Sequence, residues 1–197
     1  MITKVNQIKE TSKQAVVLTF DDGPGKYLPE ILTILQRYDI QATFFWQSRF
    51  LYKKRPWRRT VEEGHTIGSH TINHPNLLKL TYDEQYRQIH KSKQYIEAIT
   101  SQDVELFRPP FGAYNECTIK ITKELHLLPV LWSISSFDWS LKHNPIEIVN
   151  NVVDNLHDDG IILLHELEQT VKILPELIEG IQAKGFQFTN LSRSNWR

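Results

Sequence analysis

The sequence predicts an α/β fold in which a largely parallel sheet is covered by helices within a single domain. Short β-branched and apolar runs alternate along the chain with stretches of helical spacing, the pattern of parallel strands joined by helical crossovers. Roughly six or seven such units follow one another, which fits a barrel-like arrangement. Polar and ionisable residues gather directly after the predicted strands, where the loops of such a barrel converge on one face.

The individual elements follow from hydrophobic spacing and from residues that start or stop helices. Pro29 is tolerated in the first turn of the first helix, and Thr81 with Glu84 has the spacing of a capping box. Asn144 and Pro145 are expected as the N-cap and first residue of a later helix, and Gly185 ends the last one. Strands are expected at 15–20, 42–46, 65–68, 104–107, 129–134 and 161–164, and helices at 28–38, 81–99, 144–156 and 174–184.

Composition and charge exclude several classes of protein. The 197 residues suffice for one domain, 1–197, with no linker or internal repeat. Lys plus Arg and Asp plus Glu both number 23, so no net charge draws the chain to nucleic acid or to an anionic membrane. The single cysteine, Cys117, excludes an internal disulfide and is expected to be a small buried residue on a helix.

No segment has the length and apolarity of a membrane span, and residues 1–14 lack the apolar stretch of a signal peptide. As written, the sequence therefore predicts a cytoplasmic protein, or an extracellular or cell-wall one if an export segment has been removed. It carries no signal for an oligomeric state.

Five polar clusters follow predicted strands, and each has an ordinary structural reading beside a functional one. They are Asp21-Asp22, His70 with His74, Arg108, Asp138 and His165. The two aspartates could form a helix-entry turn, or divide into a metal ligand and a base. The two histidines lie four apart, which places both on one face of a helical turn, although Pro75 equally favours a tight turn.

The remaining clusters are as ambiguous when each is taken singly. Arg108 before two prolines could be a surface residue, or a cation that holds a carboxylate beside a rigid turn. Asp138-Trp139 could be a loop aspartate beside a core tryptophan, and His165 a histidine satisfied at a strand end. Two imidazoles and one carboxylate together resemble a three-ligand hydrolytic metal site with positions open for water and substrate.

Taken together, these segments resemble the polysaccharide deacetylase family, the fourth carbohydrate esterase family, over about residues 15–191. The motifs that carry the resemblance occur in order: TFDDGP at 19–24, SHTINH at 69–74, RPPFG at 108–112, DW at 138–139 and LLHE at 163–166. The resemblance implies a distorted (β/α) barrel that hydrolyses the N-acetyl groups of amino-sugar polymers or oligomers with a divalent metal ion, zinc first and cobalt, manganese or nickel as alternatives.

The resemblance also implies a role for each matching residue. The implied metal ligands are Asp22, His70 and His74. The implied catalytic residues are Asp21 as general base, Arg108 holding it, His165 as general acid and Asp138 tuning that histidine. The implied substrate contacts are the backbone N–H of Phe111, which would hold the oxyanion, and Trp139 and Leu163, which would line the acetyl pocket.

Three positions depart from the family pattern. Ser135 stands where many relatives have another aspartate, which leaves open how the residues of the DW motif are connected to their neighbours. Phe111 replaces a frequent tyrosine, and Glu166 follows the histidine where aspartate is commoner; neither change is expected to matter.

The substrate is expected to be a carbohydrate: peptidoglycan or a chitin-type oligomer first, acetylated xylan or another amide as alternatives. The basic segment 53–59 is expected to be a solvated surface, or else a contact for an anionic polymer such as peptidoglycan. A cyclic-ureide hydrolase with a metal-poor site, and a carbohydrate-binding protein without turnover, are the competing hypotheses. The five tryptophans could stack on sugars or belong to the core.

Overall fold

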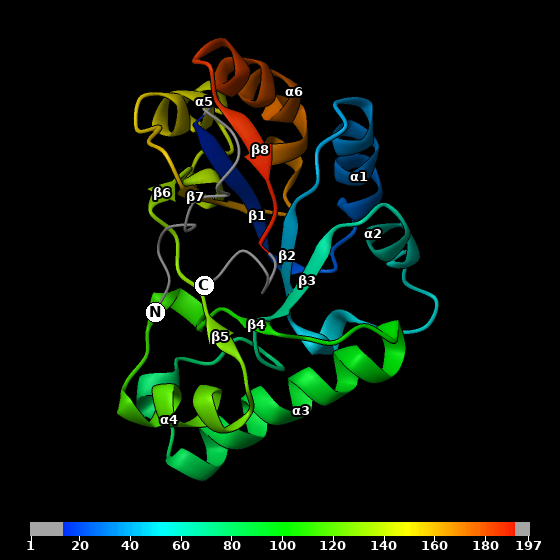
Figure 1. Cartoon of the computed structure of the whole chain (residues 1–197), viewed down its shortest axis with the longest axis vertical. Coiled ribbons are helices and arrows are strands. Elements are labelled where there is room, and N and C mark those ends of the chain that lie inside the picture. Colours follow the sequence, from blue (N-terminus) through cyan, green and yellow to red (C-terminus); the bar gives the residue numbers. More distant parts are fainter. Residues whose placement is uncertain (1–13, 192–197) are drawn as a thin grey trace.

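In a computed structural model of the chain, which describes residues 14–191, eight parallel strands form one sheet with helices on its outer side (Figure 1). The strands are β1 (Ala15–Gly23), β2 (Thr43–Trp46), β3 (Thr66–Ser69), β4 (Leu106–Phe107), β5 (Leu128–Pro129), β6 (Ile134–Ser135), β7 (Gly160–His165) and β8 (Gln187–Thr189). The helices are α1 (Leu28–Arg37), α2 (Arg58–Glu62), α3 (Tyr82–Thr100), α4 (Glu116–Glu124), α5 (Ile146–Val153) and α6 (Glu168–Ala183). Four short 3₁₀ turns add η1 (Ser48–Phe50), η2 (Leu77–Lys79), η3 (Pro110–Gly112) and η4 (Asp138–Ser140).

The sheet curls into an incomplete barrel. Its strand order is β5-β4-β3-β2-β1-β7-β6, and β8 pairs with the first residues of β1. The end strands β5 and β6 are consecutive in the chain, and only residues 130–133 separate them. So few residues span at most about 18 Å when fully extended, so the two edges of the sheet must lie close together. The predicted α/β barrel-like fold is confirmed.

Strand β1 lies in the middle of this sheet and sends alternate side chains to two different cores. Val16, Leu18 and Phe20 pack in the large cluster between the sheet and its helices, whereas Val17 belongs to a small cluster inside the curl with Phe45. Because side chains alternate along a strand, Thr19 and Asp21 share the inner face with Val17. The barrel interior is therefore apolar at the start of β1 and polar at its end.

The helices bury one apolar face each against the sheet. On α1 the buried residues keep the predicted three- and four-residue spacing: Leu28, Ile31, Leu32 and Leu35. Helices α5 and α6 pack on one another on one side of β1, as α3 and α4 do beyond β4 and β5 (Figure 1). The capping box predicted at Thr81 and Glu84 is present at the start of α3.

Three predicted elements are wrong in detail. The expected strand 129–134 is split, because its middle residues cross from one edge of the sheet to the other. Pro145, not Asn144, precedes α5, and no side chain caps that helix. The last helix begins at Glu168 and contains Pro175, although the prediction placed its start near that proline. The free energy gained by burying its apolar face exceeds the cost of the backbone hydrogen bond that an internal proline removes.

Two further differences concern short or exposed features. Strand β8 was not predicted, since three residues give too short a pattern. Cys117 lies on α4 as expected but is only half-buried. Within residues 14–191, no helix is long and apolar enough to cross a membrane. The expectation of a missing signal peptide concerns residues that lie almost entirely outside this range, and the extent of the domain over 1–197 stays a prediction.

We expect Thr81→Ala to lower the free energy of unfolding by about 1 kcal/mol, because the Thr81 side chain accepts a hydrogen bond from the Glu84 N–H in the first turn of α3. Urea unfolding followed by circular dichroism measures the change. Thr81→Ser keeps the hydroxyl and is the matched control. An equal loss in both variants would mean that the cap does not stabilise the helix.

Candidate active site

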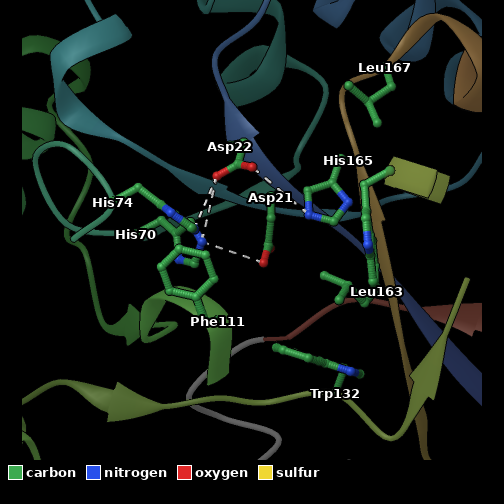
Figure 2. Close-up of a pocket in the computed structure, with 10 residues that line it drawn as sticks. Asp21, Asp22, His70, His74, Phe111, Trp132, Leu163, His165 and Leu167 are labelled. Carbon is green, nitrogen blue, oxygen red and sulfur yellow. Dashed lines mark ion pairs between the residues drawn. The ribbon is translucent and has the colours of Figure 1, made fainter. Parts of the chain in front are cut away.

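A cavity of about 440 Å³ opens at the carboxyl ends of the strands (Figure 2). It is lined by Asp21, Asp22, His70, His74, Phe111, Trp132, Trp139, Leu163, His165 and Leu167. The five polar clusters thus come together at one place: three contribute lining residues directly, and Arg108 and Asp138 lie buried behind them. Leu167 was not predicted, and Trp132 was expected only as one of five tryptophans that could stack on sugars or belong to the core.

Two histidines and one aspartate form a compact set of candidate metal ligands. The ligand atoms of Asp22, His70 and His74 all lie within 4.8 Å of one another. The Nε2 atoms of His70 and His74 are 3.7 and 3.6 Å from Oδ1 of Asp22 (Figure 2). Thr71 and His74 have positive φ angles, so the histidine pair lies on a tight turn and not on a helix. This outcome decides between the two readings of the SHTINH motif.

The environment of His70 suits a metal ligand. Its Nδ1 lies 2.7 Å from the carbonyl oxygen of Arg108, an acceptor, so Nδ1 carries the proton and Nε2 keeps the lone pair that a metal ion would need. Burial lowers the pKa of His70, which favours the neutral ring that can bind a metal.

Asp22 is held as an anion by its neighbours. Burial alone would raise the pKa of Asp22, but the imidazoles of His70, His165 and His74 and a hydrogen bond from Gln47 outweigh it and bring the pKa below its ordinary value. The Gln47 amide donates to Oδ1 of Asp22 at 2.7 Å. Gln47 was not predicted, although it directly follows β2 just as the other polar residues follow their strands.

Two imidazole nitrogens and a carboxylate oxygen are the donors of three-ligand sites for zinc and similar divalent ions. All three face one cavity, so a bound ion would keep coordination positions open toward it. The described residues therefore fit a divalent metal ion.

Arg108 is fully buried, and its guanidinium donates four hydrogen bonds. Nη1 donates to Oδ1 of Asp21 at 2.7 Å and to Oγ1 of Thr19 at 2.8 Å. Nη2 and Nε donate to the carbonyls of Leu131 and Val130 at 3.1 and 3.4 Å. The surface-residue reading of Arg108 is therefore wrong. The arginine fixes one oxygen of Asp21, and the other lies 3.7 Å from Nε2 of His70.

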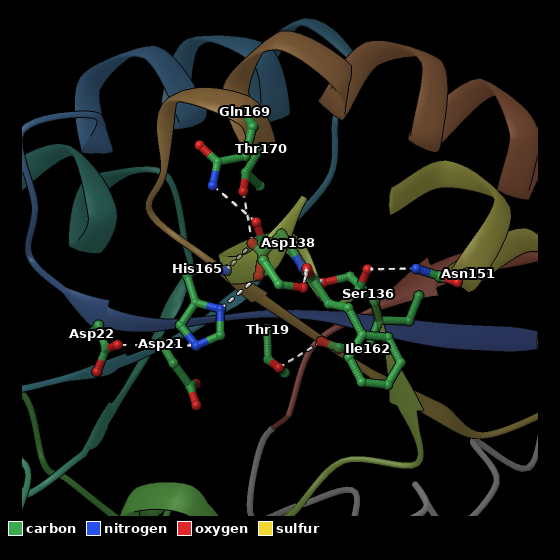
Figure 3. Close-up of polar contacts among 12 residues, drawn as sticks. Thr19, Asp21, Asp22, Ser136, Asp138, Asn151, Ile162, His165, Gln169 and Thr170 are labelled. Carbon is green, nitrogen blue, oxygen red and sulfur yellow. Dashed lines mark hydrogen bonds and ion pairs between the residues drawn. The ribbon is translucent and has the colours of Figure 1, made fainter. Parts of the chain in front are cut away.

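His165 and Asp138 form a second ion pair (Figure 3), and His165 lies across the cavity from His70 and His74 (Figure 2). Nδ1 of His165 lies 2.7 Å from Oδ1 of Asp138, while Oδ2 accepts from the backbone N–H of His165 and from Thr170. Burial lowers the pKa of His165, but Asp138, with smaller contributions from Asp21 and Asp22, raises it above the ordinary value. Nε2 of His165 faces Asp22 at 4.0 Å.

The departure at Ser135 leaves this pair intact. Ser135 lies in β6 and pairs with Leu163 in the sheet. The neighbouring Ser136 accepts from the Asp138 N–H at 3.3 Å, and Gln169 donates to the Asp138 carbonyl at 2.9 Å. Asp138 is thus held without a second aspartate in the motif.

Aromatic and apolar side chains complete the walls of the cavity. Trp139 stands edge-on to His165 with ring centroids 5.3 Å apart, and Phe111 stands edge-on to His74 at 4.5 Å. Phe111 has a positive φ of 60° and an exposed side chain. Leu163 is buried between these walls.

The remaining tryptophans divide between core and cavity. Trp46 and Trp57 are buried, as expected of core residues, and Trp132 lines the cavity. Trp196 lies outside the described residues.

Glu166 has a larger part than the sequence suggested. Its buried carboxylate accepts hydrogen bonds from the Gly25 N–H and, at 3.2 Å, from the Trp46 indole N–H. It thereby ties the residue after His165 to the loop that follows Asp22. A Cβ atom on Gly23 would lie 1.8 Å from the Glu166 carboxylate, so this approach requires a glycine. Burial raises the pKa of Glu166 to about 7.

Both the sequence and the structure resemble those of known proteins. The sequence profile described as polysaccharide deacetylase matches residues 8–130. A peptidoglycan-N-acetylglucosamine deacetylase of Bacillus cereus is 34% identical over 187 residues, 91% of this chain and 68% of that protein. The peptidoglycan-N-acetylglucosamine deacetylase PgdA of Listeria monocytogenes is 31% identical over 186 residues, 93% of this chain and 39% of that protein.

Among solved structures, BA3943 of Bacillus anthracis, described as a CE4 family pseudoenzyme, superimposes with a TM-score of 0.85 at 31% identity. The match covers 91% of this chain and 64% of that one. The chain thus spans 39% to 68% of the length of these three proteins. The structural likeness confirms the predicted barrel of the deacetylase type.

We expect Glu166→Gln to gain stability relative to the wild type as the pH rises from about 4.5 to about 7. In this range the folded protein retains the Glu166 proton while the unfolded chain has released it, so wild-type stability falls with rising pH. The slope is at most about 1.4 kcal/mol per pH unit, and an amide cannot ionise.

Urea unfolding at several pH values measures the difference between the two proteins. Glu176→Gln, on the exposed side of α6, is the matched control. A difference between Glu166→Gln and the wild type that does not change with pH would show that Glu166 is already ionised at low pH.

Proposed function

The chain belongs to the polysaccharide deacetylase family, and on that premise we propose that it removes N-acetyl groups from an amino-sugar polymer, with peptidoglycan as the first candidate. One observation carries the proposal: three candidate metal ligands and the His165–Asp138 pair face each other across one cavity. The names of the Bacillus cereus and Listeria relatives support the choice of peptidoglycan.

The proposed metal site consists of Asp22, His70 and His74, and zinc is the ion we propose, with cobalt, manganese and nickel as alternatives that suit the same donors. A divalent ion bound there would polarise the amide carbonyl and make water more acidic. An amide needs this help because it is a poor electrophile.

Asp21 is the proposed general base. Its free oxygen lies beside the metal ligands, 3.7 Å from Nε2 of His70, and so within reach of a water molecule in the cavity. Arg108 binds the other oxygen, which fixes the direction of the carboxylate. The water oxygen attacks the acetyl carbon while Asp21 takes its proton.

His165 is the proposed general acid. Asp138 holds its Nδ1, so Nε2 points into the cavity and donates a proton to the leaving nitrogen as the C–N bond breaks. The raised pKa of His165 favours the protonated ring that this role needs. The products are acetate and a free amine on the sugar.

The substrate contacts are proposed from the cavity walls. The backbone N–H of Phe111 would stabilise the oxyanion, which a left-handed turn at this residue can aim inward. Trp139 and Leu163 would enclose the acetyl methyl group, since both line the cavity near His165.

The alternatives have less support. A binding protein without turnover is suggested by the likeness to a pseudoenzyme, but this chain retains candidate base, acid and ligands together. The full ligand set also argues against hydrolysis of a cyclic ureide by a metal-poor site. O-acetylated xylan or another amide would use the same groups. A peptidoglycan substrate would place the working protein at the cell wall.

We expect His74→Ala to lose both bound metal and activity, because it removes one of three ligands. Metal-stripped protein is reloaded with Zn²⁺, its metal content is measured by mass spectrometry, and acetate release from N-acetylglucosamine oligomers and from peptidoglycan is followed. His90→Ala removes an imidazole outside the site and is the control. Unchanged zinc content in His74→Ala would contradict the ligand assignment. Absence of acetate release from fully loaded wild type would favour a binding role.

We expect Asp21→Asn and His165→Gln each to slow acetate release by about 10²–10⁴-fold while the zinc content is unchanged. Asp21→Asn should also lose stability, up to about 3 kcal/mol, because it leaves the buried Arg108 charge uncompensated. Asp103→Asn, outside the cavity, is the control. Activity within a few-fold of the wild type in either variant would reject its proposed role.

A further inference from the structure

The stretch of chain that runs from β2 into α2 concentrates positive charge in a chain whose net charge is zero. Residues 40–61 carry six basic side chains and no acidic one. Two of the six are held by the protein itself: Arg59 pairs with Glu63, and Arg55 donates to the carbonyl of Phe50. The other four are exposed and form no ion pair with any residue in 14–191: Arg49, Lys53, Lys54 and Arg58.

This segment lies on the same side of the barrel as the candidate active site. It leaves β2 at the carboxyl end of that strand and continues into α2 (Figure 1). Its first turn contacts the loop of the metal ligands: the N–H groups of Ser48 and Arg49 donate to the carbonyls of Thr71 and Ile72 at 3.1 and 3.2 Å.

A hollow of about 210 Å³ lies on the outer side of that loop, lined by Ser48, Arg49, Ile72, Lys91 and Tyr95. Arg49 comes from η1 and Lys91 from α3, so two exposed cations from different elements flank it. Ile72 is two residues from both His70 and His74, a chain distance of at most about 7 Å. We call Arg49, Lys53, Lys54, Arg58 and Lys91 the cationic rim.

The lining is suited to a carboxylate group. Arg49 and Lys91 bring two cationic N–H donors to a hollow whose exposed lining is otherwise mostly apolar. An uncharged sugar chain is not attracted by the excess of positive charge. The carboxylates on the peptide stems of peptidoglycan are attracted by it.

We propose that the cationic rim binds the carboxylates of the peptide stems of peptidoglycan, beside the sugar that the cavity holds. This inference rests on the proposed deacetylase function and deepens it, because it makes the rim the element that prefers peptide-bearing glycan to neutral chitin-type oligomers. Exposed charge pairs contribute little singly, and their attraction is screened by salt, so the preference comes from several charges together.

The test measures two charge-reversal variants on two substrates, one that carries carboxylates and one that is neutral. The substrates are peptidoglycan fragments freed of phosphate-bearing polymers, and neutral N-acetylglucosamine oligomers. The rim variant is Arg49→Glu with Lys91→Glu. The control, Arg37→Glu with Lys184→Glu, changes the net charge equally but at the ends of α1 and α6, on the opposite face of the barrel.

We expect the rim variant to raise KM for the peptidoglycan fragments by about tenfold and to leave KM and kcat for the neutral oligomers unchanged. Added salt should raise the wild-type KM for the fragments only. The control variant should behave as the wild type. An equal KM change for both substrates, or no change for either, overturns the proposal while the deacetylase function stands.

Binding without turnover supplies an independent arm. Zinc-loaded protein is sedimented with insoluble peptidoglycan, free of phosphate-bearing polymers, before and after an amidase removes its peptide stems. Stronger retention by the intact polymer, lost in the rim variant, supports the proposal even if no substrate releases acetate. Equal retention by both polymers overturns it.

Discussion

One buried guanidinium joins the architecture of the barrel to the chemistry of the cavity. Arg108 donates to the carbonyls of Val130 and Leu131, in the segment that crosses between the two edges of the sheet, and to the side chains of Thr19 and Asp21 inside β1. The crossing segment has few sheet partners of its own, so these carbonyls would otherwise be buried with little to pair with. A buried cation needs a counter-ion, and Asp21 is the nearest one. The crossing segment at the edges of the sheet and the orientation of the candidate base therefore depend on the same side chain.

The alternation of side chains along β1 places the residue that Arg108 binds in the wall of the cavity. Val17, Thr19 and Asp21 lie on the inner face of one strand, so the interior becomes polar just where the strand ends and Asp22 follows. Neighbouring strands end at the same level and deliver His70 from β3 and His165 from β7. Parallel strands are thus sufficient to bring residues more than 140 positions apart into one cavity, and Glu166 holds the two sides of that cavity together through Gly25 and Trp46.

Much of this arrangement follows from local sequence, and the failures have physical causes. Strand ends with polar residues identified Asp22, His70 and His165 because apolar runs bounded by ionisable residues are a local signal. Residues 130–133 were expected inside one strand, 129–134, because their apolar composition does not reveal that the chain crosses there from one edge of the sheet to the other. Gln47 and Glu166 went unassigned because their partners are distant in sequence, and only packing shows that the two side chains reach Asp22 and Gly25.

The distribution of charge along the barrel has a consequence for how the molecule meets its substrate. Acidic residues lie in the segments that lead into β2, β3, β4 and β7, at the amino ends of the strands: Asp39, Glu62, Glu63, Asp103, Asp158 and Asp159. The exposed basic residues near Arg49 lie at the carboxyl end of β2. Because Arg49 and its basic neighbours lie at the end of the barrel that holds the cavity, they favour contact of that end with an anionic surface. The effect acts within about 10 Å at 0.1 M ionic strength, so it selects orientation at contact and adds almost nothing to long-range capture.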